Sequence, residues 1–291
     1  MYLAKAILLG LLALLAVGFA VVWGLAVRAA RRRAGSGDAL RPTSFHLAVG
    51  FATDFLDTLG IGSFATTTTA WRLARRVDDQ RIPGTLNVGH ALPSIAQALI
   101  YVTIIRVDLR TLLAMIAAAV VGAWSGSALV AGWSRRTVRL AMGTALLVAA
   151  GILVAGMLGR LPAGGDALGL SGRRLALGVL GNFALGALMT AGIGLYAPCM
   201  ILVSLLGMSP AAAFPIMMGS CAFLMPVASL RFVRRGAYDV RAALGLALAG
   251  VPAVLVAAFL VRSLPLDAVR WLVVGVATYT AVTLLAAARS R

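Results

Sequence analysis

Two apolar segments, each interrupted by the tripeptide Gly-Ile-Gly, constrain this chain more than any other feature of its sequence. The tripeptide occupies residues 60–62 and again residues 192–194, 132 positions later. The residues around it repeat at the same spacing, so that Phe51 corresponds to Phe183. Glycine-broken apolar segments at corresponding places in two halves of a chain point to the binding site of a transporter. We therefore expect an internally duplicated chain with a shared site at its two breaks.

The composition is that of a membrane protein. Of 291 residues, 61% are hydrophobic and only 12% are charged, whereas a soluble domain has roughly 25% charged residues. The net charge of +17 comes from arginines in short clusters between apolar runs, which is the pattern of the positive-inside rule. We therefore expect a multi-pass protein of the bacterial inner membrane, with the lipid bilayer and not nucleic acid as its partner. Assembly into a homo-oligomer stays open.

Apolar runs and the basic clusters between them predict the organisation of the chain. Residues 6–27 form an apolar run long enough to span a bilayer, which takes about 20 residues, and this run has no counterpart in the second half. The expected divisions are an extra N-terminal transmembrane helix (1–30), a basic cytoplasmic linker (31–43), repeat 1 (44–158), an inter-repeat loop (159–173) and repeat 2 (174–291). The other expected spans are residues 84–105, 109–132, 137–158, 211–230, 240–261 and 266–287.

The two Gly-Ile-Gly segments, within residues 50–71 and 175–207, are predicted to be re-entrant hairpins. The first has basic residues on both flanks, so it is expected to start and end on the same side of the membrane. A non-helical turn at membrane depth is permitted only where protein or a water-filled cavity covers it. The expected fold is an all-α polytopic membrane protein of two inverted repeats, each with one hairpin and three transmembrane helices. This arrangement places more of the 26 Lys and Arg on the cytoplasmic side than eight or nine crossings would.

Breaking a helix at Gly-Ile-Gly exposes backbone N–H groups, and such a helix N-terminus binds anions. Two facing copies would form a pocket of donors for a small oxyanion, with hydroxyl groups beside them and an asparagine to orient the ligand. The alternative is that the glycines serve close helix packing and the threonines bond their own backbone. The residues expected to bind substrate are Gly60, Ile61, Gly62, Ser63, Thr66, Thr67, Asn87, Gly192, Ile193, Gly194, Tyr196 and Cys199.

Three titratable residues in apolar segments are candidates for proton coupling. Asp54 and Asp57 are the only two of the nine acidic residues that lie inside an apolar run, and their spacing puts them on one helix face. Intramembrane carboxylates are costly and usually functional, and histidine, here His90, is the residue type whose unperturbed pKa is nearest to neutral pH. Ionised carboxylates would repel an anion, so a protonated or arginine-paired state is expected. The alternatives are that Asp54 pairs with a basic loop residue at the rim and that His90 makes a structural hydrogen bond.

These residues resemble the sulfite exporter TauE/SafE family of membrane permeases. That family is built from a duplicated unit that begins G-F-x-x-G-x-x-G-I-G-G-G and later carries a short Asp-hydrophobic-Arg motif. The matching residues here are Gly50-Phe51, Gly60–Gly62, Asp108–Arg110, Phe183, Gly192–Gly194 and Asp239–Arg241, within a resemblance that covers about residues 47–287. The trailing glycines of the family pattern are replaced by Ser63-Phe64 and Leu195-Tyr196. The resemblance implies a secondary transporter that moves sulfite, thiosulfate, a sulfonate or a related organic acid.

Rival functions use the same residues differently. A metal or other cation transporter could use Asp54, Asp57 and His90 as ligands. An intramembrane hydrolase could use Ser63 as nucleophile and His90 as base, provided the two lie within hydrogen-bond reach. A membrane sensor or assembly subunit would transport nothing. The expectation is a permease with no catalytic residue, cofactor or resident metal. It is expected to be an exporter, because an inside-negative potential drives anions out of the cell.

Overall fold

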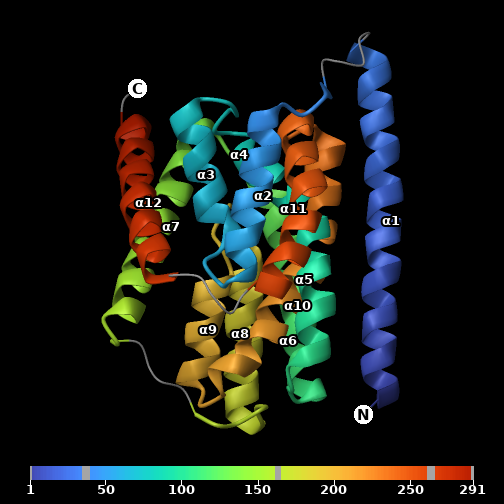
Figure 1. Cartoon of the computed structure of the whole chain (residues 1–291), viewed down its shortest axis with the longest axis vertical. Coiled ribbons are helices and arrows are strands. Elements are labelled where there is room, and N and C mark those ends of the chain that lie inside the picture. Colours follow the sequence, from blue (N-terminus) through green and yellow to red (C-terminus); the bar gives the residue numbers. More distant parts are fainter. Residues whose placement is uncertain (1, 35–39, 161–164, 261–265, 290–291) are drawn as a thin grey trace.

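The computed structural model describes residues 2–34, 40–160, 165–260 and 266–289. Parts of the predicted linker (35–39), of the predicted inter-repeat loop (161–164) and of the connection after residue 260 lie outside this range. The described residues form helices joined by turns and loops, with no strand among them, so the prediction of an all-α protein is confirmed (Figure 1). The helices are α1 (Tyr2–Ala34), α2 (Ser44–Thr58), α3 (Ser63–Ala74), α4 (Ile82–Gly89), α5 (Ala91–Ile104), α6 (Leu109–Val130), α7 (Arg135–Met157), α8 (Gly172–Met189), α9 (Tyr196–Leu205), α10 (Pro210–Arg235), α11 (Val240–Leu260) and α12 (Leu266–Arg289).

Within this range, five helices are long and apolar enough to cross a membrane, which indicates a multi-pass membrane protein. They lie in α1, α6, α7, α10 and α11. The predicted span at residues 84–105 is instead two helices, α4 and α5, that meet at His90. Pro93 explains this break, because proline has no N–H to donate to the carbonyl four residues earlier.

The two Gly-Ile-Gly segments form turns between short helices. α2 and α3 are joined at residues 59–62, and α8 and α9 at residues 190–195. In Figure 1, α2 and α3 occupy the upper half of the molecule, α8 and α9 occupy the lower half, and both turns lie near mid-height. Gly60, Gly62 and Gly192 have φ angles of 84°, 86° and 91°, a conformation that residues with a Cβ rarely adopt. The glycines are therefore required by the backbone of the turns.

Helices of the two halves pack across one another. α2 packs against α11, α8 packs against α6, and α7 packs against α12. α6 begins at Leu109 and α11 at Val240, 131 residues later. Asp108 accepts the N–H of Thr111 and thereby caps the start of α6. Asp239 accepts the N–H of Ala242 in the first turn of α11 in the same way. The Asp-hydrophobic-Arg motif thus has a structural role as a helix start.

Close approach of the paired helices depends on glycine. A Cβ added at Gly186 of α8 would overlap the carbonyl oxygen of Ala119 in α6, and one at Gly50 of α2 would overlap the carbonyl of Gly245 in α11. Backbone lies against backbone at these points, so no side-chain rearrangement can relieve the overlap.

We expect Gly186→Val to lower the free energy of unfolding by about 3 kcal/mol, because α6 and α8 must separate to admit the side chain. Gly151→Val is the matched control, since Gly151 lies in the middle of α7 with open space around it. Both variants would be compared with the parent by denaturant titration in detergent. Equal losses for the two substitutions would show that the close α6–α8 contact contributes nothing to stability.

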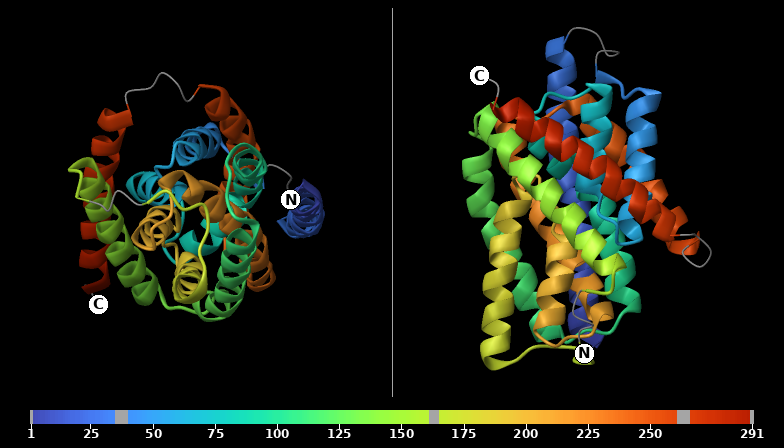
Figure 2. Two further views of the ribbon diagram at one scale, coloured as in Figure 1. Left: turned by 90° about the horizontal axis from the view of Figure 1, so that it is seen from below. Right: turned by 90° about the vertical axis from the view of Figure 1, so that its left-hand side faces the viewer.

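α1 lies at the periphery, beside α5 and α10 (Figure 2). The Lys5 ammonium donates to the Thr103 carbonyl at 2.8 Å, near the end of α5. One stripe of α1, formed by Leu8, Leu12, Phe19, Trp23 and Val27, is buried. Other apolar side chains of this helix stay exposed, among them Leu14, Val17 and Leu25, as expected for a helix that faces lipid.

Candidate functional site

The N-terminus of α3, predicted to bind an anion, is occupied by a carboxylate of the chain itself. Asp57 lies in the last turn of α2, and its Oδ1 accepts the Ser63 N–H at 2.5 Å. Ser63 is the first residue of α3, so the carboxylate meets the positive end of that helix. Asp57 is 3% exposed. The first turn therefore holds an internal anion where the sequence predicted a substrate.

Gln97 connects this carboxylate to the second half of the chain. Its Nε2 donates to Asp57 Oδ2 at 2.9 Å and to Thr58 Oγ1 at 3.1 Å. Its Oε1 accepts the hydroxyl hydrogen of Tyr196, at 2.5 Å. Because Tyr196 is the first residue of α9, one side chain of α5 joins both turns. Both carboxylate oxygens of Asp57 thus accept hydrogen bonds, as an ionised carboxylate does.

A second buried network contains Asp54 and His90. Asp54 Oδ1 lies 2.8 Å from His90 Nδ1, and His90 Nε2 lies 3.1 Å from Thr67 Oγ1. The network joins α2, the α4–α5 break and α3. Asp54 Oδ2 has no hydrogen-bond partner among the described residues and lies against Gly250 of α11.

The alternative that Asp54 lies at the rim is wrong, and of the two expected states of these acids, protonated or arginine-paired, the second is not seen among the described residues. Asp54 is fully buried and paired with His90, so it is not a rim residue bound to a basic loop. In the described part of the chain, no arginine pairs with Asp54 or Asp57. Asp54 and Asp57 have no arginine partner here because the arginine clusters lie at helix ends, whereas the two carboxylates lie halfway along the molecule.

A cavity of about 20 Å³ lies between the two turns, with room for about one water molecule. Its walls come from both halves of the chain. The lining residues are Asp57, Gly62, Ser63, Phe64, Ser94, Met189, Gly194, Leu195, Tyr196 and Cys221. Added Cβ atoms at Gly62 and Gly194 would meet almost nothing, so these glycines face open space. A polyatomic anion needs a wider cavity than this conformation provides.

The two turns differ in charge, because an acidic residue at the first turn corresponds to an uncharged residue at the second. Asp57 corresponds to Met189 at the spacing of 132 residues, and both line the cavity. No side chain caps the start of α9. Among the hydrogen bonds of the described residues, none takes the N–H of Gly194, Leu195 or Tyr196. Unpaired N–H groups at a helix start are anion-binding groups, and at the second turn no carboxylate of the chain occupies them, whereas Asp57 binds the start of α3 at the first.

The structure brings only part of the predicted substrate set to the cavity. Gly62, Ser63, Gly194 and Tyr196 line it, whereas Ile61, Ile193 and Cys199 do not. The other members have local roles. Gly60 packs near Phe214, Gly192 packs against Met142, Thr66 donates to the Gly62 and Ser63 carbonyls, Thr67 bonds His90, and Asn87 donates to the Pro83 carbonyl.

Gln97 and Ser94 are site residues that the sequence reasoning missed. Both are fully or almost fully buried in α5, three residues apart on one helix face. Met189 and Cys221 also line the cavity. A glutamine inside an otherwise apolar helix is a signal that could have found Gln97, since a buried amide requires partners.

The geometry bears on two of the rival functions. His90 uses both ring nitrogens, for Asp54 and for Thr67, which leaves neither free as a metal ligand or as a base for Ser63. Where the structure describes the chain, no group of three His, Cys, Asp or Glu side chains could hold a metal ion. The three proposed cation ligands therefore do not converge in this conformation.

Comparisons with protein-family models, with curated protein sequences and with solved structures found no match to this chain. The contacts described above are therefore the main basis for a functional proposal.

Proposed function

We propose that this protein is a secondary transporter that passes a small oxyanion through the cavity between its two Gly-Ile-Gly turns. The observation that carries the proposal is the uncapped start of α9, which faces a cavity lined by both halves. In this proposal the α2–α3 and α8–α9 hairpins enter the membrane from opposite sides, and the two halves are inverted repeats. The basic end of the molecule, with Arg31 to Arg33, then faces the cytoplasm of a bacterial cell.

The unpaired N–H groups at Gly194 to Tyr196 are the proposed binding site. They lie at the positive end of α9, where a helix carries roughly half a positive charge. The hydroxyl groups of Tyr196 and Ser94 also line the cavity, and they can donate to an anion once they leave their present acceptors, Gln97 Oε1 and Met225 Sδ. The cavity must widen before an anion can enter, because it is too small in this conformation. The glycines of both turns allow its walls to move.

In this proposal, the protonation state of Asp57 controls whether the substrate can bind. An ionised Asp57 repels an anion at Gly194 in a poorly hydrated site, so substrate enters only when this carboxyl group is protonated. Protonation also weakens its bond to the Ser63 N–H and frees the start of α3 as a second donor end. The buried Asp54–His90–Thr67 network is the proposed source of the proton, because Asp54 lies one helix turn before Asp57 on α2.

The TauE/SafE resemblance suggests sulfite, thiosulfate or sulfoacetate as the substrate. Thiosulfate and sulfoacetate are dianions near neutral pH. A dianion that leaves with one proton still carries one negative charge outward. An inside-negative potential then favours export by about 2.3 kcal/mol per 100 mV.

The test is efflux of radiolabelled sulfite, thiosulfate and sulfoacetate from proteoliposomes that hold the purified protein. We expect an imposed inside-negative potential to accelerate efflux of at least one of them and to make the vesicle interior more alkaline. Vesicles loaded with labelled rubidium are the control for a nonspecific leak. If folded protein moves none of the three anions, the transporter proposal fails, and a sensor or assembly subunit becomes the better interpretation.

A further inference from the structure

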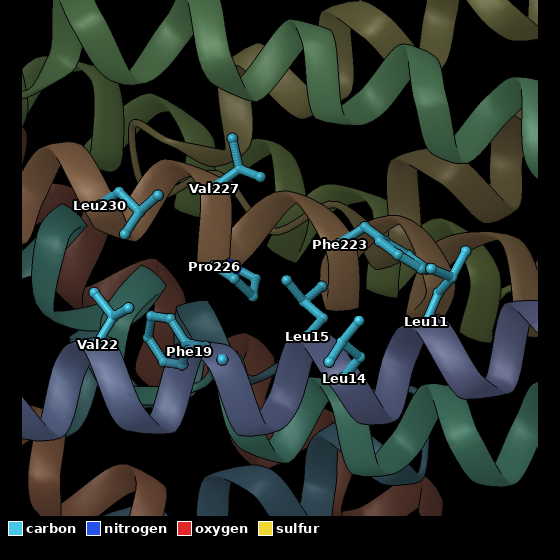
Figure 3. A pocket seen from close by; sticks show the side chains of 10 residues that line it. Leu11, Leu14, Leu15, Phe19, Val22, Phe223, Pro226, Val227 and Leu230 are labelled. Atoms are coloured by element: carbon cyan, nitrogen blue, oxygen red, sulfur yellow. The ribbon is translucent and has the colours of Figure 1, made fainter.

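An apolar groove separates the peripheral helix α1 from α10. It encloses about 410 Å³. Its walls are Leu11, Leu14, Leu15, Gly18, Phe19 and Val22 of α1, and Phe223, Pro226, Val227 and Leu230 of α10. Figure 3 shows Leu15 and Phe19 directed towards α10, and Pro226 directed towards α1. The stretch from Leu11 to Val22 is about 17 Å long at 1.5 Å per residue, close to half of a hydrocarbon core about 30 Å thick.

A basic pocket of about 290 Å³ continues from the end of this groove. Leu230 lines both cavities, so the two adjoin on α10. The other walls of the basic pocket are Trp124, Arg231, Arg234 and Arg235. Along α10 the apolar side chains thus give way to three arginines in its last turns, at the end of the molecule where the C-terminus of α1 also lies.

The arginines of this pocket lack an anionic partner. Among the ion pairs of the described residues, none includes Arg231, Arg234 or Arg235. The Arg231 guanidinium lies 4.2 Å from the Trp124 ring centre, and its Nε is buried with no acceptor. Within the described ranges, the one acceptor of Arg235 is the Ala128 carbonyl, at 3.2 Å. A buried guanidinium N–H without an acceptor is costly, which points to a missing anion.

We propose that an anionic phospholipid occupies this site. One acyl chain lies in the α1–α10 groove, and the phosphate group binds Arg231 and Arg234. The occupant must be apolar over the depth of one leaflet and anionic at its end, which is the chemistry of such a lipid. A second copy of this chain does not fit, because its only acidic residues within apolar segments, Asp54 and Asp57, are buried.

The site does not depend on transport and is tested by binding. The full chain in detergent is titrated with dioleoylphosphatidylglycerol, with dioleoylphosphatidylcholine, which has the same acyl chains and a zwitterionic headgroup, and with inorganic phosphate. Bound lipid is counted by native mass spectrometry. We expect phosphatidylglycerol to bind with a stoichiometry of one at the tightest site and to raise the thermal unfolding temperature more than the other two ligands do.

Two variants test the arginines that bind the phosphate group and the groove that holds the acyl chain separately. Arg231→Gln/Arg234→Gln is expected to weaken phosphatidylglycerol binding by about 25-fold, since a basic residue at a membrane surface contributes about fivefold. Gly18→Phe places a ring in the groove at a position where an added Cβ has open space, and it is expected to abolish the tight site. The matched controls are Arg160→Gln/Arg173→Gln, whose arginines are exposed outside the pocket, and Gly10→Phe, on α1 outside the groove.

Three results would overturn the proposal. Equal binding of phosphatidylglycerol and phosphatidylcholine would remove the role of the arginines. Stabilisation by inorganic phosphate alone to the same degree would remove the role of the groove. A dimer that dissociates only in Gly18→Phe would show that the groove is a contact between copies of the chain.

Discussion

Replacing Gly194 with leucine is expected to reduce anion efflux to the leak of empty vesicles while the protein stays folded. Gly194 lies at the cavity, and the nearest atom to an added Cβ is Phe64 Cβ, at 3.9 Å. Its φ angle lies outside the left-handed range, so leucine causes no backbone strain there. The new side chain therefore fills the cavity and covers the N–H groups at the start of α9.

The measurement is potential-driven thiosulfate efflux, together with the unfolding temperature and the monodispersity of the purified variant. Gly151→Leu is the control, because it adds the same side chain to an open position on α7. Gly62→Leu is a poorer test, since Gly62 has a φ of 86° and loss of flux there could follow from misfolding. Normal efflux in a folded Gly194→Leu protein would show that substrate passes elsewhere.

Asp57→Asn is expected to tighten thiosulfate binding by about 100-fold and to make efflux insensitive to pH. Asparagine keeps the shape of aspartate and an oxygen for the Ser63 N–H, but it carries no charge. Its NH2 group takes the place of the oxygen that accepts from Gln97 Nε2, so the Gln97 amide must rotate to offer its oxygen instead. Two unit charges about 5 Å apart interact by about 3 kcal/mol at an effective dielectric constant of about 20, which is the repulsion that the substitution removes. In the parent protein, efflux is expected to rise as pH falls, because more Asp57 is then protonated.

Binding would be followed by isothermal titration calorimetry and efflux by a pH series from pH 5 to pH 8. Asp78→Asn is the matched control, since Asp78 is ion-paired with Arg135 at an exposed position remote from the cavity. An unchanged dissociation constant in Asp57→Asn would mean that Asp57 does not compete with the substrate. A pH response that survives the substitution would assign the proton to another group.

Sequence patterns predicted most of the helices because their causes are local. Apolar length marked α1, α6, α7, α10 and α11. The positive φ angles at Gly60 and Gly192 follow from the same Gly-Ile-Gly tripeptides that marked the two turns. The starts of α6 and α11 follow from Asp108 and Asp239, since a carboxylate near a helix start is a short-range signal.

The site was only partly predictable because its contacts join residues far apart in the chain. A free helix start after Gly60–Gly62 was a reasonable expectation. Asp57, which lies six residues before Ser63 in the chain, instead accepts the N–H at this helix start. Nothing local indicated that Gln97 would bridge Asp57 and Tyr196, which are 40 and 99 residues away from it. Pairing of Asp54 with His90 depends on how α2 packs beside the α4–α5 break. The titratable residues themselves were found, because charge within an apolar run is visible in any sequence.

The packing of α2 against α11 also has a consequence for when the polar centre can form during synthesis of the chain. The α2 helix begins at Ser44, and its partner begins at Val240. At roughly 5–20 residues per second, α2 precedes α11 by about 10–40 s of synthesis. During that interval Asp54 lacks the wall that Gly250 later provides. The polar centre is therefore completed only near the end of translation, and a chain that ends before residue 240 leaves the Asp54 carboxylate uncovered on this side.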